Sequence, residues 1–445
     1  MSVMLVLGLS VAAIAPAQAA TISVSVGGDI QAAINKANPG DTIVLASGTY
    51  KRDFYTVRNG TSSAPIRITG PRDAVLKGAG SSRIAQVHHD FITLDGFTID
   101  GLHGSSTSAS GYRDKLIYAV GKVAGDGVKN LRINNMLLKN AGGECIRIKY
   151  LAENNVVENS TITNCGVYDF KFGGTGKNGE GIYIGTAPEQ TSLNPSNVRD
   201  VSKNNVVRNN TFDTQGNECV DIKEGSTANV VSGNSCTGQK DPKSAGLDSR
   251  GSGNTFEGNT IYSNLGAGVR LGGDLSTDGT NNNVRNNIFK NNSVGGIKFM
   301  ADPQGEVCGN DFTSQSSPFV GTYGGKYAQK SCSTSTTTTT APSTTSPTDA
   351  CKTYHTEQHK RDYDAIQVGV SNTVINNTEA ALHNKGCGGT TSATTEGPDT
   401  TTGYTSRQLL RCQTLHSRLH TYYKGTEAAG VDLDPLDAEL HRVGC

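Results

Sequence analysis

Short apolar segments separated by Asn and Gly turns recur along most of the chain. Six of them resemble one another and end at Ser160, Asn210, Asn234, Asn259, Asn287 and Asn310. The last five of these positions are separated by 24, 25, 28 and 23 residues, and the interval before them holds two such periods. Periods of this length are typical of a solenoid, in which each unit buries its apolar face by stacking on its neighbours.

A second strand follows in each unit, and its inward residues occupy two alternating positions. The pairs are Ile146/Ile148, Ile182/Ile184, Val220/Ile222, Leu247/Ser249, Val269/Leu271 and Ile297/Phe299. Alternate side chains of a strand point to opposite faces, so we expect these pairs to face inward and the residues between and after them to face out. Because no amphipathic segment of helix length lies between the strands, the pattern predicts an all-β fold, a right-handed parallel β-helix solenoid.

Two local patterns predict how the solenoid turns and how it begins. The recurring Asn predicts a ladder of turns, because Asn adopts left-handed backbone angles readily and can hydrogen-bond its neighbours. We therefore expect a structural role for it and no catalytic one. Residues 28–37 have helical apolar spacing, which predicts a short helix that caps the open N-terminal end of the solenoid.

Composition divides the chain into four segments. Residues 1–20 combine an apolar stretch with the small residues Ala17 and Ala19, which predicts a secretory signal peptide. The β-helix domain is expected over residues 21–332. Residues 333–350 are almost entirely Ser, Thr and Pro, which predicts an extended, O-glycosylated linker. Residues 351–445 contain four cysteines and helix-like spacing, which predicts a small disulfide-stapled helical module.

Cysteine usage and charge indicate the compartment and the class of partner. Six cysteines precede the linker and four follow it, so we expect pairing within each set in an oxidising compartment. The 40 basic and 40 acidic residues cancel and form no basic block, which argues against nucleic acid as a partner. Beyond the leader no apolar run is long enough to cross a bilayer. We expect a secreted, extracellular, monomeric glycoprotein with no membrane partner.

Ionisable residues recur at the outward positions of the second strand. They are Arg147, Lys149, Tyr183, Asp221, Lys223, Asp248, Arg250, Arg270 and Lys298, and Glu144, Glu180 and Glu218 precede the same strands. Because stacked coils lie about 4.8 Å apart, these residues form one stripe that is long enough for several sugar units. A solvated charged face gives the same pattern without any function. The mixture of cations and carboxylates on an otherwise Asn-, Ser- and Gly-rich surface favours a functional site.

This stripe suits β-elimination of a uronic-acid polymer. A cation has to offset the substrate carboxylate while a base removes the adjacent ring proton, and Lys223 can be that base if Arg250 on the next coil lowers its pKa. Calcium would be held by oxygen ligands from the acidic residues. We expect an exposed Lys223, whose removal hardly alters stability because exposed ion pairs contribute about 0–1 kcal/mol.

Several segments resemble the β-helix polysaccharide lyases of the alginate lyase and chondroitinase B group. They are residues 30–50, 60–66, 143–148, 218–223 and 247–250, and the resemblance extends over most of residues 25–300. It implies a lyase with Lys223 as the base, Arg250 as the acid or leaving-group partner, and Glu218 as a calcium ligand.

The same resemblance leaves one ligand position open. The family's second ligand glutamate falls at Gly216, so Asp221 or Glu180 would have to replace it. An acidic polysaccharide is the implied partner. The remaining stripe residues would then bind it, namely Arg147, Lys149, Tyr183, Asp248, Arg270 and Lys298.

Other interpretations stay open. Pectate lyases of the β-helix kind also pair a calcium-binding acidic cluster with a Lys or Arg base. A polygalacturonase-like hydrolase is less favoured, because only the segment 147–149 is similar and the acidic and histidine motifs that should precede it are missing. A non-catalytic carbohydrate- or wall-binding module would use the same stripe without turnover. In the tail, His355/His359 and His416/His420 have i, i+4 spacing, for which exposed helix faces are favoured over a metal site.

Overall fold

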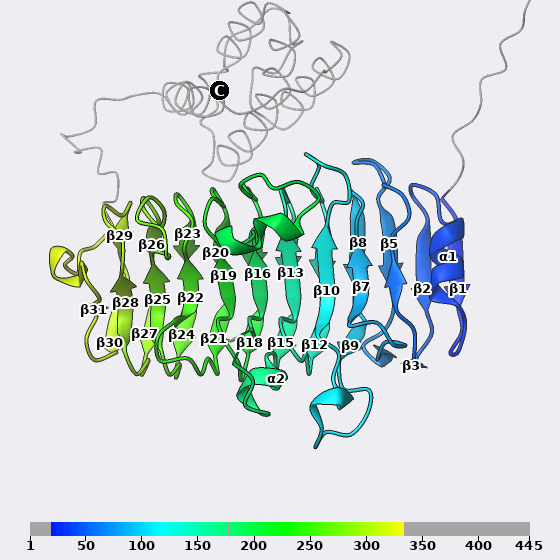
Figure 1. Ribbon diagram of the computed structural model, residues 1–445, viewed down its shortest axis with the longest axis horizontal. Helices are drawn as coiled ribbons and strands as arrows, with labels where there is room; N and C mark the ends of the chain where they lie inside the picture. The colour runs from blue at the N-terminus through cyan, green and yellow to red at the C-terminus, as the bar shows by residue number, and fades with distance from the viewer. Residues whose placement is uncertain (1–18, 176–177, 333–445) are drawn as a thin grey trace, which may run out of the picture. The chain divides into compact units, whose positions relative to one another are not determined.

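Parallel strands build three sheets in the computed structural model, which describes residues 19–175 and 178–332 (Figure 1). Sheet A contains β1 (Thr21–Val24), β2 (Thr42–Leu45), β5 (Ile66–Thr69), β8 (Ile92–Asp95), β11 (Arg132–Asn134), β14 (Val156–Glu158), β17 (Val206–Arg208), β20 (Val230–Ser232), β23 (Thr255–Glu257), β26 (Asn283–Arg285) and β29 (Val307–Cys308). Sheet B contains β3 (Gly48–Tyr50), β6 (Ala74–Leu76), β9 (Thr98–Asp100), β12 (Leu137–Lys139), β15 (Thr161–Thr163), β18 (Thr211–Asp213), β21 (Ser235–Thr237), β24 (Thr260–Tyr262), β27 (Ile288–Lys290) and β30 (Asp311–Ser314). Sheet C contains β4 (Phe54–Tyr55), β7 (Arg83–Val87), β10 (Lys115–Val120), β13 (Ile146–Lys149), β16 (Ile182–Ile184), β19 (Val220–Ile222), β22 (Ala245–Ser249), β25 (Ala267–Leu271), β28 (Gly295–Phe299) and β31 (Phe319–Val320).

Every coil passes through the three sheets in turn, and every strand pairs with the equivalent strand of the next coil. The predicted all-β, parallel β-helix is therefore confirmed. The helical elements are short: α1 (Ile30–Lys36), α2 (Val167–Phe170), and the 3-10 turns η1 (Ala109–Gly111), η2 (Pro188–Leu193) and η3 (Gly324–Lys326). The expected linker and C-terminal module, and nearly all of the expected leader, lie outside the described residues.

The core lies inside the coils, as the alternation predicts. Every member of the six inward pairs of sheet C is at most 1% exposed. Sheet B adds an aromatic and aliphatic column in which the rings of Phe289 and Phe312 stack at 4.9 Å. Full burial of such a side chain contributes about 1.5–3 kcal/mol, so stacking of equivalent residues supplies most of the driving force.

The predicted Asn ladder exists, but its two expected properties are divided between adjacent residues. Asn210, Asn234, Asn259, Asn287 and Asn310 are buried, and the Nδ2 of each of the first four donates to the Oδ1 of the next at 2.9–3.1 Å. The left-handed backbone lies one position earlier, for example at Asn209 (φ 55°) and Asn286 (φ 54°). One left-handed residue turns the chain sharply from sheet A to sheet B, and this directs the following side chain into the coil.

Two further ladders hold the other corners. Asn155, Asn205, Asn229 and Asn254 are linked at 2.8–3.0 Å before sheet A, and Asn264, Asn292 and Gln315 are linked at 2.9–3.0 Å before sheet C. Each amide both donates and accepts, so the polar corners of the buried interior are satisfied by the neighbouring coils.

Both ends of the solenoid are covered, and three disulfides cross-link its coils. The predicted N-terminal helix is α1, which buries Ile30 and Ile34 and is capped by the Asp29 side chain. At the other end the Tyr327 ring stacks 3.9 Å from Phe299. The disulfides are Cys145–Cys165, Cys219–Cys236 and Cys308–Cys332, which confirms pairing within the first set. No helix in the described part of the chain is long and apolar enough to span a membrane.

Replacing Asn234 by Ala should destabilise the β-helix by several kcal/mol. The change removes the acceptor for Asn210 and the donor to Asn259 and to the Val207 carbonyl. Each buried polar group left without a partner costs about 1–3 kcal/mol. Equilibrium urea denaturation measures the loss. Asn209→Gly, at an exposed left-handed position, is the control and should change stability by less than about 1 kcal/mol; equal losses would contradict the ladder.

Candidate active site

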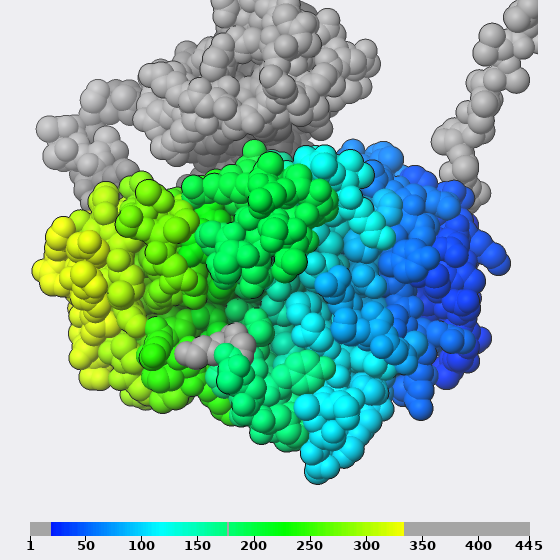
Figure 2. Space-filling model, in the orientation of Figure 1, coloured from blue at the N-terminus to red at the C-terminus, as the bar shows by residue number. Residues whose placement is uncertain are grey.

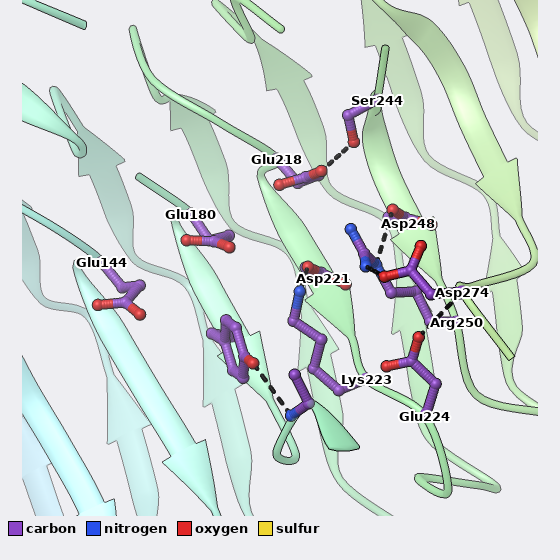
Figure 3. A network of polar contacts seen from close by, with 12 residues as sticks. Glu144, Glu180, Glu218, Asp221, Lys223, Glu224, Ser244, Asp248, Arg250 and Asp274 are labelled. Atoms are coloured by element: carbon purple, nitrogen blue, oxygen red, sulfur yellow. Dashed lines mark hydrogen bonds and ion pairs between the residues drawn. The ribbon is translucent and has the colours of Figure 1, made fainter. Parts of the chain in front are cut away.

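The candidate residues of sheet C lie side by side on successive strands. Register pairs Arg147 with Tyr183, Tyr183 with Asp221, Asp221 with Asp248, Asp248 with Arg270, and Arg270 with Lys298. Lys149, Lys223 and Arg250 form a second column, in which the Lys223 and Arg250 amides donate to the preceding coils at 2.8 Å. Glu144, Glu180 and Glu218 form a third column just before β13, β16 and β19 (Figure 3).

Loops cover this face, so the stripe is not the exposed surface that we expected. Asp221 and Asp248 are fully buried, and Lys223 is only 6% exposed. What remains open is a polar cleft of about 300 Å³, at the small end of the range for ligand pockets. Figure 2 shows a hollow in this face, within the green part of the surface. Candidate residues that line the cleft are Glu180, Tyr183, Glu218, Lys223, Arg250 and Arg270.

Three carboxylates converge at the cleft. One oxygen each of Glu180, Glu218 and Asp221 lies within 4.8 Å of the others, and all three residues are buried. Burial and the neighbouring Glu144 carboxylate raise the pKa of Glu180 to about 7. Burial, Asp221 and Glu180 raise the pKa of Glu218 well above its usual value. Packing like charges together in a dry site is costly, so this cluster needs a positive partner.

The oxygens of this cluster fit a hard cation. Glu218 Oε2 and Asp221 Oδ1 are buried without a hydrogen-bond partner among the described residues, whereas the other Glu218 oxygen accepts from the Ser244 hydroxyl. Ca²⁺ prefers carboxylate and other oxygen ligands. The three residues are the metal ligands that we expected from the sequence. The structure brings them together in one place.

Gly216 cannot be a ligand for a structural reason. A Cβ atom at this position would lie 2.2 Å from the Cys165 carbonyl oxygen and 2.7 Å from that of Gly179. Contacts below 3.0 Å to backbone are not tolerated, so the site of the family's second glutamate has no room for a side chain. The Glu180 carboxylate, one coil earlier, is the acidic group that lies beside Glu218 and Asp221 instead.

Lys223 is held as a cation. Its Nζ lies 2.5 Å from Asp221 Oδ2 and 4.5 Å from the centre of the Tyr183 ring. Burial is the largest influence on the pKa of Lys223 and acts to lower it, but the acidic groups of Asp221, Tyr183 and Glu180 together outweigh burial and raise the pKa. Arg250 does lower the pKa of Lys223, as we expected, but its effect is smaller than that of Asp221. The expectation of an exposed ion pair was wrong, because the covering loops exclude water from it.

Two arginines share one buried carboxylate behind Lys223. Arg270 Nη1 lies 2.8 Å from Asp248 Oδ2, and Arg250 Nε lies 3.7 Å from the same oxygen. Arg250 also pairs at 3.0 Å with the exposed Asp274. Asp248 thus holds both guanidinium groups at the cleft and is itself out of reach of a ligand.

The remaining candidates flank the cleft. Arg147 pairs with Glu144 at 3.0 Å and lies over the Tyr183 ring at 4.2 Å. Burial raises the pKa of Tyr183 to about 12, so its hydroxyl stays protonated. Burial and the nearby Arg147 lower the pKa of Lys149 to about 8. Lys298 donates to the Lys243 carbonyl at 2.8 Å and does not line the cleft.

Several residues of the cleft were missed in the sequence. They are Asn178, Ala187, Glu189, Gln190, Asn217, Asp241, Lys243 and Ser244, which come from loops without a repeated pattern. Lys171 Nζ donates to the Ser106 carbonyl at 2.8 Å, which joins two loops on this side of the molecule. Long insertions between coils were the available signal, and the insertion at 186–200 contributes Ala187, Glu189 and Gln190 to the lining of the cleft.

Comparisons with known proteins agree with this fold. A family model described as right handed beta helix region matches residues 197–340. The chain is a right-handed parallel β-helix protein. Curated protein sequences gave no match.

Among solved structures, an alginate lyase from Paenibacillus sp. str. FPU-7 has a TM-score of 0.52 at 22% identity, over 66% of this chain and 98% of that chain. Pectate lyase Pel9A has a TM-score of 0.45 at 14% identity, over 65% and 77%. A mannuronic acid specific polysaccharide family 6 lyase from human gut microbiota has a TM-score of 0.40 at 18% identity, over 63% and 67%. At 22% identity, the likeness to the Paenibacillus alginate lyase shows a shared fold only.

Lys223→Met should lower the free energy of unfolding by about 3–5 kcal/mol, because it leaves the buried Asp221 carboxylate without its partner. Urea denaturation at pH 7 with a chelator present measures the loss. Adding Asp221→Asn to the variant should restore most of it. Lys290→Met, an exposed lysine of β27, is the control and should change stability by less than about 0.5 kcal/mol. A loss below about 1 kcal/mol for Lys223→Met would contradict the buried pair.

Proposed function

We propose that this protein is a secreted polysaccharide lyase that cleaves a uronic-acid-containing polymer by β-elimination. One observation carries the proposal: the buried carboxylates of Glu180, Glu218 and Asp221 converge at a polar cleft that also holds Lys223 and Arg250, and Glu218 and Asp221 keep oxygens without a hydrogen-bond partner among the described residues. The three disulfides and the signal-like leader support secretion. An acidic sugar fits because it brings a carboxylate to a cleft whose walls carry both charges.

The reaction needs one proton removed and one supplied. The base takes the ring proton next to the uronate carboxylate, the electron pair forms a carbon–carbon double bond, and the bond to the leaving oxygen breaks. We assign the base to Lys223 and the leaving-group partner to Arg250, which stays protonated and offsets charge on the departing oxygen while that oxygen takes its proton from solvent water. Arg147 and the protonated Tyr183 hydroxyl orient the sugar on one side, and Arg270 orients it on the other.

Lys223 has to lose its proton before it can act. In the free protein Asp221 holds that proton in place. A calcium ion on Glu180, Glu218 and Asp221 would neutralise the substrate carboxylate and compete with Lys223 for Asp221. The calcium charge and Arg250 would then both disfavour the protonated form of Lys223. The acidic cluster and the base thus belong to one charge-balanced unit.

The first test is turnover, read as ultraviolet absorbance from unsaturated uronate ends on alginate, pectate, glucuronan and glycosaminoglycans. Lys223→Arg preserves the ion pair with Asp221 but cannot give up a proton, so the rate should fall by about 10²–10⁴-fold with the fold intact. Lys290→Arg is the matched control and should keep wild-type rates. If Lys223→Arg retained turnover, Lys149 would be the next base to test.

The free energy of unfolding should fall as the pH rises and should increase when calcium is added. The pKa of Glu180 rises from 4.5 to about 7 on folding, so its contribution is complete below pH 4.5 and is lost as the pH rises through 7. With a chelator, the free energy of unfolding should fall by on the order of 3 kcal/mol between pH 5 and pH 8.

Calcium at millimolar concentration should raise the melting temperature at pH 8 and have little effect at pH 5, where the cluster is protonated. Mg²⁺, which keeps its waters and demands octahedral geometry, should stabilise less. Glu180→Gln should flatten the pH dependence and weaken the calcium shift. A calcium shift that is equal at both pH values would remove the metal site from the proposal.

A non-catalytic binding module is the second candidate. The observation in its favour is that Lys223, Arg250 and Arg270 are all neutralised by carboxylates in the free protein. Affinity electrophoresis in gels that contain each polymer decides between the two. Retention by one polymer without any rise in ultraviolet absorbance, with and without calcium, would favour the module over the lyase.

A further inference from the structure

The cleft is closed on its N-terminal side by the insertion at 186–200. This segment follows β16, but it folds back over the preceding coil, where Gln190 Oε1 accepts a hydrogen bond from Arg147 Nη2. Further along the segment, the Ser196 hydroxyl lies 2.5 Å from the Tyr150 hydroxyl. The insertion is therefore attached both to the outward face of β13 and to the turn that follows this strand.

The ionisable stripe of sheet C is buried beyond this closure. Arg147 and Lys149 are 8% and 3% exposed, and Tyr118, which pairs with Arg147 on the preceding coil, is 6% exposed. On this side the floor of the cleft ends at β16, with Tyr183 and Glu180. The sequence predicted a stripe that is open over several coils. In the structure, only the part from β16 onward is open to a ligand.

The C-terminal side of the cleft is open. In the described chain only short turns, 263–266 and 291–294, precede β25 and β28, so the wall next to these strands is low. Arg270 on β25 lines the cleft. Met300, just after β28, is 37% exposed. A sugar chain can therefore enter the cleft from the C-terminal coils, whereas the insertion blocks its continuation toward the N-terminal coils.

The size of the cleft agrees with a single open end. A volume of about 300 Å³ holds about one or two sugar rings. Lys223 and Arg250, the two groups assigned to the reaction, line this same space (Figure 3). An internal stretch of a polymer has to enter a cleft and leave it again, which requires two openings. The end of a chain requires only one.

We propose that the cleft binds the end of an acidic polysaccharide chain and that the protein acts from this end, releasing unsaturated mono- or disaccharides. The inference rests on the proposed function for the reaction and for the class of polymer. The bonds made and broken are those of the β-elimination described above, applied to the first or second glycosidic bond of the chain. At equal mass, short chains are then better substrates than long ones, because they offer more ends.

Product analysis on the polymer that is cleaved tests this inference. Ultraviolet absorbance should rise while the viscosity of the solution stays nearly constant, and an unsaturated mono- or disaccharide should be the main product from the first time point. Below saturation and at equal mass, the rate should increase in proportion to the number of chain ends. An early fall in viscosity, with a mixture of long fragments, would overturn the inference.

A variant tests the closed end itself. Gln190→Ala removes the hydrogen bond between the insertion and Arg147, and it leaves Arg147 paired with Glu144. The share of products longer than a disaccharide should rise severalfold. Ser192→Ala, at an exposed position of the same turn η2, is the matched control and should keep the wild-type products. Circular dichroism checks the fold of both variants. Unchanged product lengths in Gln190→Ala would contradict a closed end at Arg147.

Binding stoichiometry separates this inference from the lyase proposal. Lys223→Arg, in which turnover should be lost, is titrated by calorimetry with a short and a long size fraction of polygalacturonate and of alginate. One bound protein per chain at both lengths supports the chain-end site, even if the wild type cleaves nothing and the lyase proposal fails. A number of bound proteins that rises with chain length overturns the chain-end site, and cleavage by the wild type then leaves the lyase proposal standing. Absence of both binding and cleavage overturns both.

Discussion

Everything in this protein depends on the registration of one coil upon the next. Parallel strand pairing fixes equivalent residues about 4.8 Å apart, and three buried amide ladders prevent a slip because each amide must both give and receive a hydrogen bond. A one-residue shift would turn the apolar columns out and bury charge. The repeated sequence is thus a direct record of this constraint, because every coil has to offer the same group at the same corner.

The same registration concentrates charge at the cleft. Any residue type that is repeated on adjacent coils becomes a column. Glu144, Glu180 and Glu218 are therefore stacked even though their carboxylates repel one another. The fold tolerates them by stacking cations beside them, with Lys115 and Arg147 on Glu144 and Lys223 on Asp221. Where this compensation is incomplete, at Glu180 and Glu218, burial and the neighbouring carboxylates raise the pKa, and one Glu218 oxygen has no hydrogen-bond partner among the described residues. A site built this way costs stability and gains affinity for a cation or a charged ligand.

Charge is also divided along the sheet. The cleft holds matched cations and carboxylates, in which each positive group is positioned by a buried acid. Toward the N-terminal coils the cations Arg83, Lys122 and Lys149 stand over or beside tyrosine rings. Matched pairs suit chemistry that needs defined geometry. The two regions lie on one unbroken sheet.

Sequence alone determined the solenoid and the order of residues along its central outward column. It could do so because stacking in register turns a one-dimensional repeat into a three-dimensional column, so Arg147, Tyr183, Asp221 and Asp248 could be aligned without coordinates. Only the tertiary structure decided which of these residues are dry and how they are paired. Loops such as 186–200 have no repeat, and they remove water from Lys223 and Asp221. The pKa of Lys223 then depends on a 2.5 Å contact and on burial, and neither is encoded in spacing along the chain.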